Sequence, residues 1–177
     1  MIAERLAAVR ERIARAAARA GRQAADVTLV GVSKTHTPET VRAAAAAGLL
    51  VFGENKVQEA DAKIGALADL RASVRWHLVG HLQKNKARRA AQLFDCVHSV
   101  DGAELSRKLN AGAADAGRAL SVLVQVDLAG EETKFGCPES QLFPLLETLK
   151  ALPALRTDGL MIPVSYTHLT LPTIYSV

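Results

Sequence analysis

Residues 27–35 read VTLVGVSKT, an apolar run rich in β-branched residues that ends in a single lysine. A short run of this kind, after the polar stretch 21–26, is typical of a strand buried in a parallel sheet. Burying an ammonium group inside such a strand is costly. We therefore expect Lys34 at the carboxyl end of the strand, the edge where parallel α/β architectures bind ligands. There it either reaches solvent as an ordinary lysine or forms a Schiff base with an aldehyde.

The rest of the chain repeats this strand pattern. Apolar runs predict further strands at 49–53, 74–80, 95–100, 119–127 and 155–162. Helical stretches of roughly ten to fifteen residues separate them, which favours βα units and a parallel sheet. A doubly wound sheet and a (β/α)8 barrel both fit this alternation. A complete barrel needs about 250 residues, so a chain of 177 residues would hold an incomplete one.

Sequence patterns typical of helices support the same alternation of strands and helices. An apolar stripe predicts an additional helix at 2–20, before the first strand. Thr37 followed by Pro38 is typical of an N-cap and the first helical position. Asp101 with Glu104 three residues later resembles a capping box, so we expect Asp101 to cap the helix after the fourth strand.

Five segments in order resemble one known family. Residues 30–35 (VGVSKT) are similar to the first-strand motif of the pyridoxal 5′-phosphate (PLP) homeostasis family, whose fold is that of the alanine racemase N-terminal domain. Residues 52–59 (FGENKVQE) resemble the family's FGENYVQE, and residues 76–86 (WHLVGHLQKNK) resemble its WHFIGPLQSNK. Residues 134–136 (KFG) and 159–161 (GLM) resemble the ends of its fifth and sixth strands. The resemblance favours the barrel, of which about six strands would be present.

The resemblance implies that Lys34 carries PLP as a Schiff base. It also implies cofactor contacts for four residues near strand ends: Asn55, His77, Ser99 and Met161. Each has a plainer interpretation as well. Asn55 would be a turn residue, His77 and Met161 core residues, and Ser99 simply the end of its strand.

The chain departs from the family's motifs at two places. Lys56 stands where the family usually has tyrosine, and His81 where it has proline. A third feature is a basic helical stretch containing Lys84, Lys86, Arg88 and Arg89. This stretch is either a solvated helix face or a site that meets anionic PLP or a PLP-accepting enzyme.

Composition excludes several other classes. The chain has a net charge of +4, but its arginines are scattered and aromatic residues are only 4%, so we expect no nucleic-acid partner. No signal peptide or membrane-spanning run is present, and we expect a cytoplasmic protein without membrane contact. Cys96 and Cys137 lack CxxC spacing, so no metal site is expected.

The last fourteen residues, 164–177, contain no alanine, glycine or charged side chain, unlike the preceding chain. They resemble a translated sequencing adapter, and we interpret them as a non-native tail after a partial barrel at 1–163. In the resembling family, the phosphate-binding Gly-Ser-Thr segment and its arginine lie in the last third, and no such segment occurs here. We therefore expect this chain to bind PLP more weakly than a whole family member.

The resulting hypothesis is a PLP-binding homeostasis protein that holds the cofactor and delivers it to apo-enzymes, without a dedicated substrate of its own, and is a monomer at full length. One alternative is a PLP-dependent amino-acid racemase of the same barrel type. The racemase is disfavoured because it needs a second base, a tyrosine, and both tyrosines lie in the tail. The other is a PLP-independent enzyme that uses Lys34 to form a Schiff base with a sugar aldehyde.

Overall fold

The computed structural model describes residues 1–127 and 135–163. Its helices are α1 (Ile2–Arg19), α2 (Pro38–Ala46), α3 (Val57–Ala66), α4 (Ala87–Leu93), α5 (Ala103–Asp115) and α6 (Glu139–Lys150). Its strands are β1 (Gly31–Val32), β2 (Val51–Glu54), β3 (Arg75–Leu78), β4 (Cys96–Val100), β5 (Leu120–Asp127), β6 (Cys137–Pro138) and β7 (Leu155–Met161). Short 3-10 turns η1 (Ala24–Asp26), η2 (Ala68–Leu70) and η3 (Lys84–Lys86) connect them.

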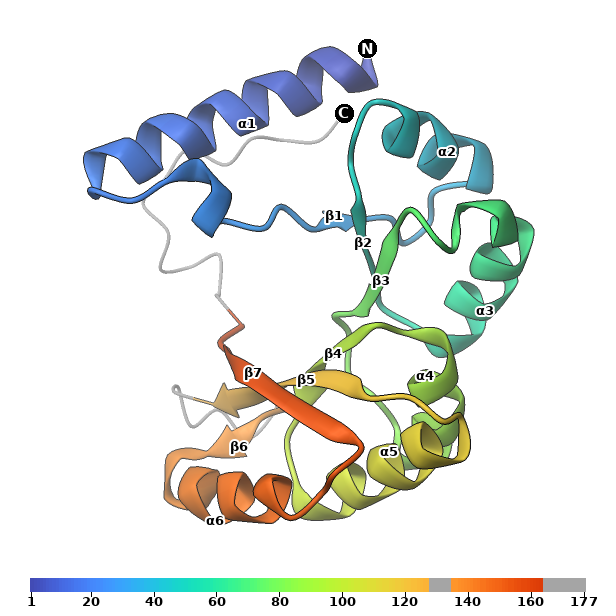
Figure 1. Cartoon of the computed structure of the whole chain (residues 1–177), viewed down its shortest axis with the longest axis vertical. Helices are drawn as coiled ribbons and strands as arrows, with labels where there is room; N and C mark the ends of the chain where they lie inside the picture. The colour runs from blue at the N-terminus through green and yellow to red at the C-terminus, as the bar shows by residue number, and fades with distance from the viewer. Residues whose placement is uncertain (128–134, 164–177) are drawn as a thin grey trace.

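The strands form one parallel sheet. Its order is β1-β2-β3-β4-β5-β7, and the two-residue β6 pairs with the end of β5. Figure 1 shows α2, α3, α4 and α5 following one another around the outer side of the strands, while α1 lies apart at one end. The parallel βα alternation expected from the sequence is thus confirmed, with the curvature of an incomplete barrel.

The core lies between the strands and these outer helices. Phe52 and Trp76 are cross-strand neighbours with ring centroids 5.5 Å apart, and both are fully buried. Leu78, Val97 and Val122 form the next helix-facing row across β3, β4 and β5. Alternation along each strand turns the intervening residues to the opposite, inner face of the sheet.

One register row defines that inner face. It runs through Val32, Gly53 and His77 and continues through Cys96, Ser121 and Arg156. A Cβ atom on Gly53 would meet Val32 at 3.4 Å and Val79 at 3.3 Å, so the inner side chains crowd closely over this glycine. The side chain of Val32 is nevertheless 47% exposed, because β1 is paired on one side only within the described residues.

The first strand is shorter than the sequence pattern predicts. The run 27–34 was expected to be a strand throughout, but only Gly31 and Val32 pair with β2. The neighbouring strand β2 begins at Val51, and Gly31 pairs with Phe52, its second residue. The residues of the run before Val30 therefore have no β2 residue opposite them, and the apolar character of the run does not extend the strand.

Of the two helix N-caps predicted from the sequence, one is confirmed and one is wrong. Thr37 caps α2 by accepting a hydrogen bond from the amide of Thr40, with Pro38 at the first helical position. The expected cap at Asp101 is wrong: Gly102 occupies the N-cap of α5 without a side-chain cap. Glu104 instead forms ion pairs with Lys84 and Lys108, so its carboxylate is directed to lysines rather than to the helix end.

The predicted helix at 2–20 is confirmed as α1, which Arg10 ties to the end of α2 through the carbonyl of Gly48, 2.6 Å away. None of the helices within residues 1–127 and 135–163 is long and apolar enough to span a membrane.

Candidate functional site

The candidate site lies where the parallel strands end. Lys34 follows β1 and Asn55 follows β2, whereas His77 lies within β3, Ser99 near the end of β4, and Met161 at the end of β7. Because β1 and β2 are adjacent, the structure brings Lys34 and Asn55 to neighbouring strand exits. Met161 lies at the opposite end of the strand order from Lys34, on β7, where it pairs with Gln125 of β5.

Lys34 is exposed, and the chain around it is held firmly. The amide of Ser33 continues the β1–β2 ladder by donating to the carbonyl of Gly53, 2.8 Å away. The Ser33 side chain is buried on the helix side, where its hydroxyl donates to Glu54. Lys34, the next residue, lies in a turn closed by the hydrogen bond from the amide of His36 to the carbonyl of Ser33, and its side chain is exposed.

A buried ion pair lies beneath this exit. The Nζ atom of Lys63, on α3, donates to Oε1 of Glu54 and to the main-chain carbonyl of Ser33, each at 2.6 Å. Glu54 is fully buried at the end of β2, and Lys63 is 8% exposed. The second carboxylate oxygen of Glu54, Oε2, is buried without a hydrogen-bond partner among the described residues. The pair joins α3, β2 and the residue preceding Lys34.

The residue after Lys34 is strained. Thr35 has a φ of 65°, a left-handed conformation that is unfavourable for a β-branched side chain. Thr35 and Lys63 also line an open hollow of about 480 Å³ between α2 and α3. The lysine is therefore fixed from both sides, by a buried clamp before it and a constrained turn after it. A larger hollow of about 750 Å³ runs along α1 and contains none of the predicted site residues.

The position of Asn55 depends on the close approach of Gly80 to its backbone. A Cβ atom on Gly80 would lie 2.3 Å from the carbonyl oxygen of Asn55 and 2.8 Å from its Cα. Only a residue without a side chain lets the loop after β3 lie this close to the loop after β2. Gly80 therefore sets the position of the Asn55 backbone at the strand edge.

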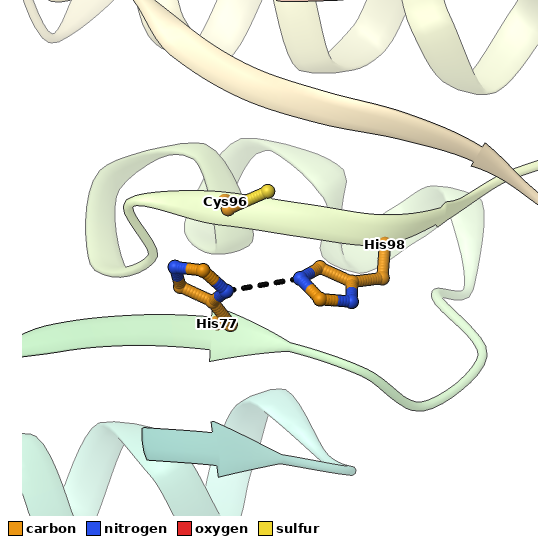
Figure 2. A group of neighbouring side chains, drawn as sticks. All are labelled: His77, Cys96 and His98. Carbon is orange, nitrogen blue, oxygen red and sulfur yellow. Dashed lines mark hydrogen bonds between the residues drawn. The ribbon is translucent and has the colours of Figure 1, made fainter. Parts of the chain in front are cut away.

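His77 has a partner that the sequence pattern did not identify. Its Nδ1 lies 2.9 Å from Nε2 of His98 on β4, and the buried thiol of Cys96 is its direct neighbour across the ladder (Figure 2). Burial lowers the pKa of His77, and burial together with the neighbouring His77 lowers the pKa of His98 to about 4. Cys96 and His98 are two apart in a strand, a spacing that places both on one face and was a usable signal.

Ser99 lies at an irregularity in β4. Val97 pairs with Val122, but Val100 pairs with Val124, so β4 contains one extra residue between them. His98 still lies on the inner face, where its ring meets His77, and the alternation is interrupted after it, at Ser99. The hydroxyl oxygen of Ser99 is buried and has no hydrogen-bond partner among the described residues.

The basic stretch after β3 is largely neutralised. Lys84 pairs with Glu104, Arg88 with Asp115, and Arg89 with Asp61. The first of these lies in η3 rather than in α4. These pairings make the stretch a less concentrated positive patch than its sequence suggests.

The fold and the row of strand-end residues define a partial barrel of the alanine racemase type. The family model for the alanine racemase N-terminal domain matches residues 5–168. The pyridoxal phosphate homeostasis protein of Pseudomonas aeruginosa is 46% identical over 160 residues, covering 90% of this chain and 69% of the relative. Its counterpart in Escherichia coli K12 is 38% identical over 161 residues, with the same shares covered.

A solved structure gives the same result. PipY of Synechococcus elongatus, solved with PLP bound, superposes with a TM-score of 0.82 at 39% sequence identity, covering 96% of this chain and 73% of PipY. The chain therefore belongs to the pyridoxal phosphate homeostasis protein family, within the alanine racemase N-terminal domain class. The expected fold class, an incomplete barrel of this type, is confirmed.

Proposed function

We propose that this chain is a PLP-binding protein of intracellular PLP homeostasis and that Lys34 is the residue that carries the cofactor. The observation that supports this most directly is the exit of β1. An exposed lysine leaves the carboxyl end of a parallel strand, next to the exit of β2, in a chain 39% identical to a protein solved with PLP. The Lys34 amine would condense with the aldehyde carbon of PLP, forming a C=N bond and releasing water.

The residues present fit this cofactor. Asn55, at the neighbouring exit, carries an amide that can donate to and accept from substituents of a pyridine ring. Ser99 offers a buried hydroxyl that lacks a partner among the described residues. We assign both to cofactor contact, together with His77 and Met161 on the adjoining strands.

PLP and the chain would contribute different parts of this function. PLP itself would supply the electrophilic aldehyde. The chain would bind it, hold the Lys34 amine at a fixed strand exit, and release it to apo-enzymes without converting a substrate of its own. The clamp formed by Lys63 and Glu54 supports the positioning role, because it fixes the carbonyl group one residue before Lys34.

Reductive trapping tests this proposal. The 177-residue chain is incubated with PLP, reduced with borohydride and digested, and the modified lysines are mapped by mass spectrometry. We expect most of the label on Lys34, and we expect Lys34→Arg to abolish that labelled peptide. Lys108→Arg is the matched control: this lysine is half exposed on α5, and its replacement should leave the labelling of Lys34 unchanged.

Two further arms separate the alternatives. Equal labelling of all exposed lysines in the native chain would contradict a dedicated site at Lys34. Trapping of a sugar phosphate aldehyde in preference to PLP would favour the PLP-independent enzyme. Formation of D-alanine from L-alanine by the PLP-loaded chain would favour the racemase; we expect none.

A further inference from the structure

A second group of side chains on the inner face has a chemistry of its own. His77 on β3 and Cys96 and His98 on β4 place one ring nitrogen of each histidine and the cysteine Sγ within 4.8 Å of one another. Figure 2 shows the two imidazole rings facing each other between the strands, with the cysteine on the same stretch of β4. Within residues 1–127 and 135–163, no other group of three histidine, cysteine or acidic residues is gathered this closely.

We propose that His77, Cys96 and His98 form a binding site for one zinc-type divalent cation, with a fourth coordination position left open. Two imidazoles and one thiolate are a ligand set that suits zinc, and three protein ligands with one open position are typical of zinc sites that accept a further ligand. The proposal does not involve Lys34, but it shares His77 with the proposed cofactor contacts, so the zinc test is made on the PLP-free chain.

The geometry requires only small movements. Tetrahedral zinc with Zn–N distances of about 2.05 Å separates two ligand nitrogens by about 3.3 Å. The two nitrogens are now 2.9 Å apart, so the rings would open by a few tenths of an ångström. A thiolate at about 2.3 Å from zinc lies about 3.6 Å from each nitrogen, which a modest rotation of the Cys96 side chain achieves from within the present 4.8 Å.

The strands hold the ligands in this arrangement. His77 and Cys96 are register partners in the parallel β3–β4 ladder. His98 follows Cys96 by two residues and projects from the same face. Ligands carried by strands keep their geometry better than ligands on loops, so the site is largely formed before an ion arrives.

Protonation is compatible with binding. A neutral imidazole has one nitrogen lone pair, and the hydrogen bond between the two rings requires one nitrogen to donate and the other to accept. One proton now lies between Nδ1 of His77 and Nε2 of His98. On binding, that proton would move to the remote nitrogen of its own ring.

The cysteine would supply the released proton. Burial, with Asp158 nearby, raises the pKa of Cys96 to about 12, so the free thiol is protonated. A bound cation would deprotonate it, and one proton would pass to solvent for each ion bound. The neighbouring charges of Arg156 and Asp158 largely cancel, because they form an ion pair at 2.7 Å.

Zinc titration of the reduced, chelator-stripped and PLP-free chain tests the proposal. We expect binding of one Zn²⁺ per chain by calorimetry and a rise in the melting temperature. Cobalt(II) reports on the ligands: we expect a thiolate-to-cobalt charge-transfer band in the near ultraviolet. Cys96→Ser should abolish the band and weaken Zn²⁺ binding by at least about tenfold.

Matched controls exclude binding elsewhere. Cys137→Ser removes the other buried cysteine, which lies on β6, and should leave both the band and the affinity unchanged. His98→Gln should weaken Zn²⁺ binding while keeping a similar volume at the site. Lys34→Arg should have no effect, so failure of this proposal is distinct from failure of PLP binding.

Two results would overturn the proposal. If Cys96→Ser, shown to be folded by its melting curve, binds Zn²⁺ as tightly as the unmodified chain, the three residues are not the ligands. Absence of a thiolate-to-cobalt band in the native chain leads to the same conclusion.

Discussion

The ammonium group of Lys63 donates a hydrogen bond to the main-chain carbonyl of Ser33, 2.6 Å away, so that α3 holds the residue immediately before Lys34. The same ammonium neutralises the buried carboxylate of Glu54. The position of Ser33 and the charge of Glu54 therefore depend on the same ammonium group. Removing Lys63 would leave the Glu54 carboxylate unpaired and would release the main chain at the exit of β1.

Replacing Lys63 by methionine should destabilise the fold by about 3–5 kcal/mol, because it leaves a carboxylate buried without its partner. The double variant Lys63→Met/Glu54→Leu should recover most of that loss, since it removes both charges. Urea denaturation measures the free energies of unfolding. Glu59→Ala is the control: this residue is exposed on the same helix, and its loss should change stability by less than about 0.5 kcal/mol. Equal losses for the single and double variants would refute the coupling.

Thr35→Gly should stabilise the chain by about 0.5–1 kcal/mol. Glycine adopts the same left-handed conformation without the cost of roughly 1–2 kcal/mol that a residue with a side chain meets, and part of that gain is offset by the greater freedom of glycine in the unfolded chain. Thr35→Ala is the control, because alanine retains the Cβ atom and the strain. Chemical denaturation of both variants distinguishes strain relief from loss of threonine contacts. A stabilised Thr35→Ala variant would show that the conformation is not the cause.

Gly80→Ala should cost about 1–3 kcal/mol, because its Cβ atom would overlap the backbone of Asn55. The displaced Asn55 should also reduce PLP trapping at Lys34. Gly65→Ala provides the contrast: nothing lies within 4 Å of a Cβ atom there, and helix α3 should gain about 0.5–1 kcal/mol. Thermal melts together with the trapping yield test both parts. An unaltered trapping yield in a destabilised Gly80→Ala variant would remove Asn55 from the cofactor site.

Asp95→Asn should destabilise the fold by about 1–3 kcal/mol, whereas Asp69→Asn should have an effect below about 0.5 kcal/mol. Both aspartates accept two hydrogen bonds from one arginine, Arg71 for Asp95 and Arg42 for Asp69. Burial alone would raise the pKa of Asp95, but Arg71, the amide of Trp76 and Arg118 outweigh it and lower the pKa. Similar losses in the two variants, measured in urea, would show that burial does not distinguish the pairs.

Much of the fold was predictable because it depends on local patterns. The alternation of apolar runs gave the parallel sheet, and Thr37 with Pro38 gave the start of α2. The length of β1 was not predictable, because it depends on where β2 begins. Asp101 matched a local capping pattern, but Glu104 is paired with lysines instead.

The site divides in the same way. The place of Lys34 followed from one strand and its final residue. The partners Glu54 and Lys63 were not recognised, because the contact joins a strand end to a helix and no fixed sequence spacing marks it. The approach of His77 to His98 likewise depends on strand register, which periodicity does not define. The roles of Asn55, His77, Ser99 and Met161 toward PLP stay predictions, and the tail at 164–177 lies outside the described residues.

Because β4 contains one extra residue, the number of residues in this strand decides which side chains face inward on either side of the bulge. Before the bulge, β4 contributes Cys96 to the inner face; after it, Val100 again pairs in the helix-facing row with Val124. Deleting one residue between Val97 and Val100 would restore a regular ladder, yet it would remove His98 or Ser99 from the inner site. This segment is therefore expected to tolerate exchange of side chains better than any change in the number of residues.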